Sequence, residues 1–69
     1  MFLIQSKVTG KEYEPKNCVF LRNTLQVSKY LQHGAELLDL TVAYDGKITY
    51  VFSRDDTYEL YQLWQEKRL

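Results

Sequence analysis

The sequence is poor in the residues that hold very small proteins together. Its 69 residues contain a single cysteine, Cys18, and a single histidine, His33. An internal disulfide needs two cysteines and a structural zinc site needs four ligands of the Cys and His type, so we expect neither. A chain of this length buries only about 60% of its unfolded surface on folding. Its stability must therefore come from an efficient aromatic core or from a second protein chain.

Long apolar runs and clusters of positive charge are also missing. The apolar stretch at the start covers residues 1–4 only, which is too short for a signal peptide or a membrane span. Nine Lys and Arg balance nine Asp and Glu, with five positive and two negative residues in 1–35 and four positive and seven negative in 36–69. Nonspecific nucleic-acid binding needs clustered Lys and Arg. We therefore expect no membrane or nucleic-acid partner, and the lone cysteine is typical of a reducing, cytoplasmic location.

Few groups in the sequence could catalyse a reaction. His33 would have to be the base of any Ser-His-Asp or Cys-His site, but it falls at the end of a predicted helix, where an exposed histidine is ordinary. Three isolated glycines form no phosphate-binding loop. The pair Asp55-Asp56 is explained by the start of a helix, where the dipole favours negative charge. We expect no enzyme, no catalytic residues, no cofactor and no metal site.

Hydrophobic periodicity predicts four strands and two helices. Apolar alternation favours a strand over residues 2–8, and a short apolar run favours another over residues 18–21. Gly10 and Pro15 indicate a loop over residues 9–17 between them. The remaining two strands are predicted to form a hairpin.

Capping residues indicate where the predicted helices begin and end. Asn23 is typical of a helix start, with Gln26 completing a capping box, and Gly34 ends this helix. Ser53 begins the second helix, which runs to the C-terminal end. On the first helix, Leu25 lies opposite the apolar side, so we expect it to be exposed.

The hairpin is the most informative stretch of the sequence. A two-residue turn at positions 45–46 would place the large residues of the two arms on opposite faces. A three-residue loop, Tyr44–Gly46, instead places them on one face, with the pairs Val42 with Ile48, Leu40 with Tyr50 and Leu38 with Phe52. The sequence therefore predicts a bulged loop with Gly46 in the left-handed conformation and a largely polar opposite face.

Together these elements predict an α+β fold in the order ββαββα. Residues 1–69 form a single domain, because the chain is too short for two. The economical arrangement is a small antiparallel sheet with two helices on one face.

Tyrosine is the most over-represented side chain, with six residues in the chain. Tyr and Trp are enriched at interaction hot spots, because they bury a large area at a low entropic cost. We expect Tyr13 in the loop, Tyr44 at the turn and Tyr58 on the outer side of the second helix to be exposed. With Leu25, these residues are the candidates for binding a partner.

Three runs of the sequence, 27–39, 45–53 and 57–64, resemble short uncharacterised proteins from phages and prophages of Gram-positive bacteria. The shared pattern is a helix ending Tyr-Leu-x-x-Gly, a second hairpin arm ending Phe-Ser, and a last helix with a Leu-x-x-x-Trp spacing. The resemblance covers about residues 18–69 and brings no catalytic or binding residues with it. It implies a small cytoplasmic accessory protein that binds a host bacterial protein.

Three functions follow from these observations. The first is a protein-binding module that inhibits a bacterial defence system or host enzyme, as anti-CRISPR proteins do. The second is a homo-oligomer that sequesters a small nucleotide between its chains. The third is a nucleic-acid-binding regulator, against which the charge balance argues.

Overall fold

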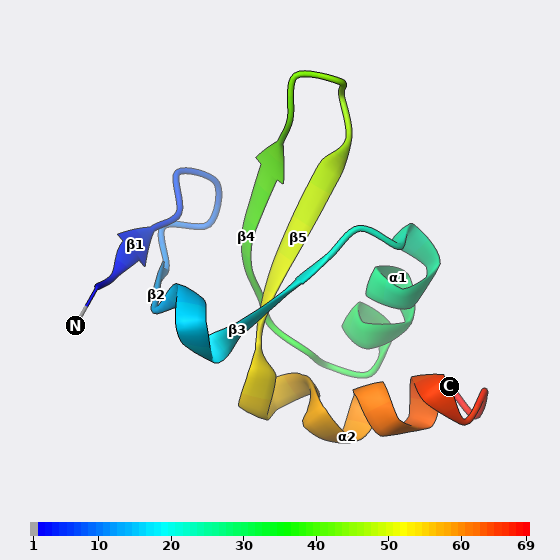
Figure 1. The fold of residues 1–69 in the computed structure, drawn as a ribbon. Coiled ribbons are helices and arrows are strands. Elements are labelled where there is room, and N and C mark those ends of the chain that lie inside the picture. Colours follow the sequence, from blue (N-terminus) through cyan, green and yellow to red (C-terminus); the bar gives the residue numbers. More distant parts are fainter. Residues whose placement is uncertain (1) are drawn as a thin grey trace.

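The structure, a computed structural model, describes residues 2–69, so position 1 of the predicted domain lies outside it. These residues form an α+β fold with two α-helices and two small antiparallel sheets (Figure 1). The elements in chain order are β1 (Ile4–Gln5), β2 (Glu12–Tyr13), the 3-10 helix η1 (Pro15–Asn17), β3 (Cys18–Leu21), α1 (Thr24–Gln32), β4 (Leu37–Val42), β5 (Ile48–Ser53) and α2 (Arg54–Gln65). Within the described residues, neither helix combines the length and the hydropathy needed to cross a bilayer.

The larger sheet has three strands in the order β3-β5-β4. Strand β5 lies in the centre, and its Val51 and Phe52 are fully buried on opposite faces. The strand predicted over residues 18–21 is confirmed as β3, which pairs antiparallel with β5. Strands β3 and β4 are consequently the two edges of the sheet.

The predicted three-residue hairpin loop is confirmed. Gly46 N donates to Ala43 O at 3.0 Å, and Ala43 N donates to Lys47 O at 2.9 Å. Val42 pairs with Ile48, as the apolar register predicts. Gly46 has a φ of 83°, a left-handed conformation that glycine adopts without a steric penalty.

The far end of the same hairpin differs from the prediction. Leu37, rather than Leu38, lies opposite Phe52, because a bulge between Leu37 and Asp39 inserts one residue. The insertion sends Leu38 to the face opposite the helices, where it packs near Val51. An apolar pattern alone does not reveal such a bulge, since Leu37 and Leu38 are equally apolar.

Helix α1 begins as predicted but is capped in a simpler way. The Asn23 side chain accepts hydrogen bonds from Leu25 N at 3.0 Å and Gln26 N at 3.1 Å. The capping-box prediction for Gln26 is wrong, because its amide instead donates to the Tyr30 hydroxyl at 2.9 Å inside the core. Gly34 follows the helix with a φ of 89°, which confirms its predicted role.

The second helix, α2, starts at the predicted position without the predicted side-chain cap. Ser53 occupies the N-cap position, but its side chain makes no capping bond. The Thr57 hydroxyl instead donates to Ser53 O at 2.9 Å, and Asp56 accepts a bond from Glu36 N at 2.9 Å. Both helices contribute to the cluster around Phe52, which comprises Val27, Tyr30 and Ala35 with Val19, Leu21, Leu37, Tyr50, Leu60, Trp64 and Leu69 packed against it.

The first 17 residues differ most from the prediction. A single strand over residues 2–8 is wrong, because only Ile4–Gln5 form a strand. The predicted loop contains Glu12–Tyr13, which pair with β1, and the 3-10 helix η1. The predicted order ββαββα is therefore one strand short, because the observed order is βββαββα. Strand β1 pairs with β2 in a small N-terminal hairpin and not with the main sheet.

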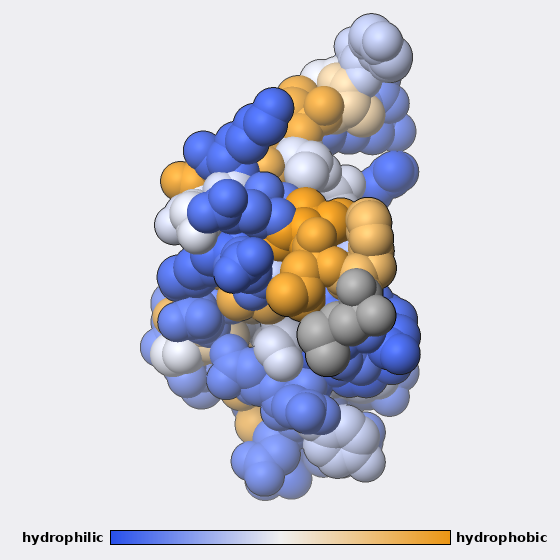
Figure 2. Space-filling view, turned by 90° about the vertical axis from the view of Figure 1, so that its left-hand side faces the viewer, coloured by the Kyte–Doolittle hydropathy of each residue, from blue (hydrophilic) through white to orange (hydrophobic). Residues whose placement is uncertain are grey.

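The N-terminal hairpin covers the sheet face that the sequence predicts to be polar. Tyr13 and Ile4 pack there with Cys18, Val51 and Leu38 into a second cluster. Figure 2 shows hydrophobic atoms gathered near the centre of the side that carries β1 and β2, surrounded by hydrophilic atoms. The exposed apolar side chains of this segment are Phe2, Leu3 and Val8.

The molecule exposes more surface than its mass requires. Scaling gives roughly 4,500 Å² for a compact monomer, whereas this 8.2 kDa chain exposes 5120 Å². Its radius of gyration is 12.1 Å, against about 11 Å expected for this length. The excess of about 600 Å² approaches the area that one partner buries in a standard interface, about 800 Å².

Candidate functional site

Three of the four candidate residues are exposed, and one is not. Leu25, Tyr44 and Tyr58 are exposed, Tyr44 completely so at the tip of the hairpin. Tyr13 is only 7% exposed, so its predicted exposure is wrong. Tyr13 belongs to the N-terminal hairpin, and its ring packs near Val51 of the main sheet.

Tyr13 belongs to a buried polar cluster around Asp39. The Tyr13 hydroxyl donates to Asp39 Oδ2 at 2.5 Å, and the Ser6 hydroxyl donates to Asp39 Oδ1 at 2.6 Å. Leu40 N also donates to Asp39 Oδ1, at 2.7 Å. Ser6 Oγ in turn accepts bonds from the backbone of the β1–β2 turn, so the Asp39 carboxylate ties this turn to β4.

The pKa values of this cluster reflect its burial and its hydrogen bonds. Burial alone would raise the pKa of Asp39, but the bonds from Ser6, Tyr13 and Leu40 outweigh it and lower the pKa below 3.8. Burial, followed by the bond to Asp39, raises the pKa of Tyr13 to about 12. Every polar side-chain atom buried in the described residues has a hydrogen-bond partner. The cluster therefore has a structural role, because its bonds join the N-terminal hairpin to β4.

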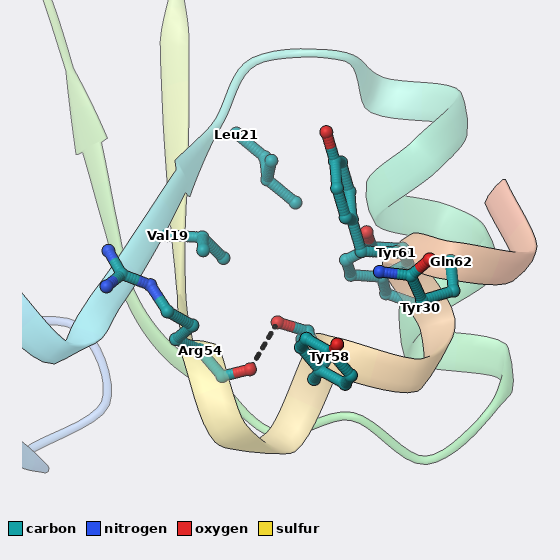
Figure 3. A pocket seen from close by; sticks show the side chains of 8 residues that line it. Val19, Leu21, Tyr30, Arg54, Tyr58, Tyr61 and Gln62 are labelled. Atoms are coloured by element: carbon teal, nitrogen blue, oxygen red, sulfur yellow. Dashed lines mark hydrogen bonds between the residues drawn. The ribbon is translucent and has the colours of Figure 1, made fainter. Parts of the chain in front are cut away.

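A groove lies between the edge strand β3 and helix α2, on the helix side of the sheet. It has a volume of about 300 Å³ and is lined by Val19, Leu21, Tyr30, Arg54, Thr57, Tyr58, Tyr61 and Gln62. In Figure 3, Val19 and Leu21 project from β3 toward the side where Tyr58 and Tyr61 lie. We call this hollow the β3–α2 groove.

The sequence builds this groove from two simple periodicities. Val19 and Leu21 are two residues apart on a strand and therefore point to the same face. Arg54, Tyr58 and Tyr61 are spaced four and three residues apart, which places them on one stripe of α2. The floor is Tyr30, which is held by an edge-to-face contact with Phe52 at a ring-centroid distance of 5.7 Å.

A second hollow adjoins the groove toward the C-terminal end of α2. Its volume is about 640 Å³, and its lining comprises Leu21, Leu25, Gln26, Lys29, Tyr61, Trp64, Gln65, Lys67 and Leu69. Leu21 and Tyr61 line both hollows, so the two form one continuous surface. We call the second one the C-terminal hollow.

The charged side chains along this surface have one sign. The charged residues that line the two hollows are Arg54, Lys29 and Lys67, and no Asp or Glu of residues 2–69 is among the lining. Arg54 lies beside the edge strand, where its guanidinium donates to Cys18 O at 3.4 Å. The surface is therefore apolar and aromatic with a positive rim, although the chain as a whole is neutral.

The structure brings together two of the four predicted residues and adds others. Tyr58 lines the β3–α2 groove and Leu25 lines the C-terminal hollow, whereas Tyr44 lines neither. Tyr61 is not among the four predicted residues, yet it is 45% exposed and lies where the two hollows meet. The signal that could have found it is the Arg54, Tyr58, Tyr61 spacing.

The outer edge of β3 is open beside this groove. Ala43 N and Lys47 O are hydrogen-bonded, and pairs alternate along an antiparallel ladder, so Tyr50 and Phe52 direct their backbone groups toward β3. Their partners there are Leu21 and Val19. The N–H and C=O of Phe20, which lies between them, consequently point away from the sheet.

Other chemistry is sparse in the described part of the chain. No group of three or more His, Cys, Asp or Glu side chains in residues 2–69 could hold a metal ion. Cys18 is buried, its Sγ lies 3.4 Å from Glu14 O, and burial raises the pKa of its thiol. A raised pKa lowers the thiolate fraction, which makes this cysteine a poor nucleophile.

Comparison with known proteins finds no relative: no protein family, no curated protein and no solved structure matches the chain. The resemblance to phage proteins over residues 18–69 stays a prediction.

Proposed function

We propose that this protein is a non-catalytic binding module that captures another protein through the β3–α2 groove and the C-terminal hollow. The observation that carries the proposal is the continuous concave surface, apolar in its floor and positive at its rim, beside an open strand edge. Ligand sites in proteins are typically concave and mostly apolar, with a few placed polar groups.

The residue types along this surface also support protein binding. Tyr and Arg are enriched at binding hot spots, and Arg54, Tyr58 and Tyr61 form one stripe along the groove. A bound partner would cover apolar surface that this small core leaves exposed.

The identity of the partner follows only from the resemblance to phage proteins. It favours a host bacterial factor, such as a nuclease of a defence system, that the module inhibits by occupying its surface. This part of the proposal is independent of the geometry of the groove. It is tested by whether the captured protein is a bacterial defence or host factor.

The test uses the protein as bait in lysates of a Gram-positive host, with two variants in parallel. The double variant Tyr58→Ala/Tyr61→Ala removes two rings from the groove, and Tyr44→Ala removes an equally exposed ring from the hairpin tip. We expect a stoichiometric partner whose affinity falls about tenfold or more in the double variant and stays unchanged in Tyr44→Ala. Equal capture by all three proteins would contradict a role for the groove.

A small nucleotide is the second candidate occupant. The C-terminal hollow combines Trp64 and Tyr61 with Lys29 and Lys67, which are groups that stack on bases and pair with phosphates. Calorimetric titration with nucleoside mono- and triphosphates, together with the solution mass by light scattering, separates this function from protein binding. A monomer that binds no nucleotide would exclude an oligomer that sequesters nucleotides. The third function, a nucleic-acid-binding regulator, would be excluded if the protein causes no salt-dependent shift of DNA or RNA in a gel.

A further inference from the structure

We infer that the occupant of the groove is an extended segment of a second protein, which adds as a strand to the outer edge of β3. The segment carries apolar side chains at every second position of the paired stretch, and acidic side chains flank that stretch on the same face. This inference rests on the proposed function, and it specifies the conformation and the chemistry of the partner at that same surface.

The open backbone of Phe20 is the first argument. Its N–H and C=O point outward, and no strand of residues 2–69 pairs with this edge. Strand addition to an exposed edge is a common way to bind an extended peptide, since the main-chain bonds supply affinity whatever the side chains are. Phe20 itself is 53% exposed, so the edge is reachable.

The position of the groove is the second argument. A strand paired outside β3 directs every second side chain toward the face on which Val19 and Leu21 lie, which is the groove side. The α2 stripe from Arg54 to Tyr61 covers about 10 Å of helix axis, the length of about three strand residues. Two alternate side chains of the segment would therefore lie between β3 and the tyrosines.

Charge is the third argument. The rim of the two hollows carries Arg54, Lys29 and Lys67 and, within the described chain, no acidic lining residue. Complementary charge favours a partner with Asp or Glu near these positions and disfavours a basic one. Arg54 is also well placed for a carboxylate, because its guanidinium already lies at the edge of β3.

A second copy of this chain fits the edge poorly. Antiparallel self-pairing about Phe20 would bring Arg22 of one copy opposite Cys18 of the other. Cys18 O is where Arg54 binds, so the pairing would place two arginines together at both ends of the interface. Like charges in close apposition oppose association, which is why we favour a different, acidic partner.

The first experiment selects binders from a displayed library of random 12-residue peptides against the full chain. We expect enriched peptides with two apolar residues separated by one position, acidic residues flanking this stretch, and no proline within it. Enrichment of a helical spacing of apolar residues, enrichment of basic peptides, or no enrichment would overturn the inference.

The second experiment removes a single donor from the strand edge. The chain is short enough for chemical synthesis, and joining two segments at Cys18 allows N-methylation of Phe20, which deletes its N–H and keeps its side chain. Since one buried hydrogen bond is lost, we expect the affinity for the selected peptide to fall about 10- to 100-fold. N-methylation of Val42, whose N–H points outward from the other edge near the hairpin tip, is the matched control and should leave the affinity unchanged.

The outcomes separate this inference from the function on which it rests. Circular dichroism and thermal unfolding first confirm that both N-methylated proteins fold. If N-methylation of Phe20 leaves binding intact while Tyr58→Ala/Tyr61→Ala abolishes it, the groove binds its partner without strand addition and the inference is wrong. If neither change affects binding, the proposed function fails as well. Loss of binding with N-methylated Phe20 and with the double variant, but not with N-methylated Val42, supports both.

Discussion

Replacement of Tyr13 by phenylalanine tests how the N-terminal hairpin is fastened to the sheet. The change deletes only the hydroxyl that donates to Asp39 Oδ2 at 2.5 Å and keeps the ring that packs near Val51. The carboxylate retains its bonds from Ser6 and Leu40. The loss of stability therefore measures one hydrogen bond to a buried charged acceptor.

The size of this loss follows from the charge on the acceptor. A hydrogen bond to a charged group contributes about 1.5–3 kcal/mol to stability. The pKa of Tyr13 is raised from 10.0 to about 12, first by burial and then by the bond to Asp39, so the whole shift, about 2.7 kcal/mol, is an upper bound on the part that belongs to the bond. We expect Tyr13→Phe to lower the free energy of unfolding by about 2 kcal/mol at pH 7.

The dependence on pH gives the prediction its distinctive form. Because the folded-state pKa of Tyr13 is raised, its contribution is fully present below pH 10.0 and is lost as the pH rises through about 12. The difference between the wild type and Tyr13→Phe should therefore be constant from neutral pH to about 9 and shrink above 10. Other titratable groups are common to both proteins and cancel in the difference.

The assay is urea-induced unfolding followed by Trp64 fluorescence and by circular dichroism at a series of pH values. Tyr44→Phe is the control, because Tyr44 is fully exposed and its hydroxyl has no buried partner. The reasoning would be refuted if Tyr13→Phe lost no more stability at pH 7 than this control does. A difference that persisted unchanged at pH 12 would equally refute the role of the hydroxyl.

Three further changes probe other parts of the fold. Asn23→Ala removes the N-cap of α1 and should lower the unfolding free energy by about 1 kcal/mol. Ser53→Ala should change it little, because the Ser53 side chain makes no capping bond. Chemical denaturation compares the two variants. Gly46→Ala forces a side chain into a φ of 83° and should cost roughly 1–2 kcal/mol, while Gly46→Asn should cost less in the same thermal unfolding assay. The pKa of Asp39 is lowered from 3.8, so its carboxylate contributes stability above that pH and loses this contribution in more acid solution. The difference in stability between the wild type and Asp39→Asn should therefore shrink below pH 4 in acid titrations.

The sequence predicted those parts of the fold that depend on local rules. The hairpin register followed from the period-2 pattern of apolar residues and from Gly46, because the three-residue loop needs a residue in the left-handed conformation. The start of α1 followed from Asn23. Each of these signals lies within a few neighbouring residues. The bulge beside Asp39 did not follow from any local pattern, and the Asp39 carboxylate there is bound by Ser6 and Tyr13, which lie 33 and 26 residues away.

The candidate site was only partly predictable, for the same reason. Tyr58 and Leu25 could be placed on outer helix faces from the helical period. Tyr13 could not be placed, since a tyrosine in a predicted loop is buried or exposed depending on what folds over it. The groove itself arises where β3 passes α2, and no local pattern in either segment encodes how far apart they lie.

The two edges of the main sheet differ in a way that bears on the proposed partner. On β4, the Thr9 hydroxyl donates to Leu38 O at 2.6 Å, and Leu40 N donates to the Asp39 side chain. These contacts occupy outward groups that could otherwise recruit a strand, as natural proteins commonly arrange at exposed edges. On β3, the outward groups of Phe20 stay open beside an apolar groove. On β4 the outward groups near the N-terminal hairpin are occupied and those of Val42 near the tip are open, whereas β3 combines open groups with an apolar groove, so association should occur through β3 rather than by nonspecific pairing at both edges.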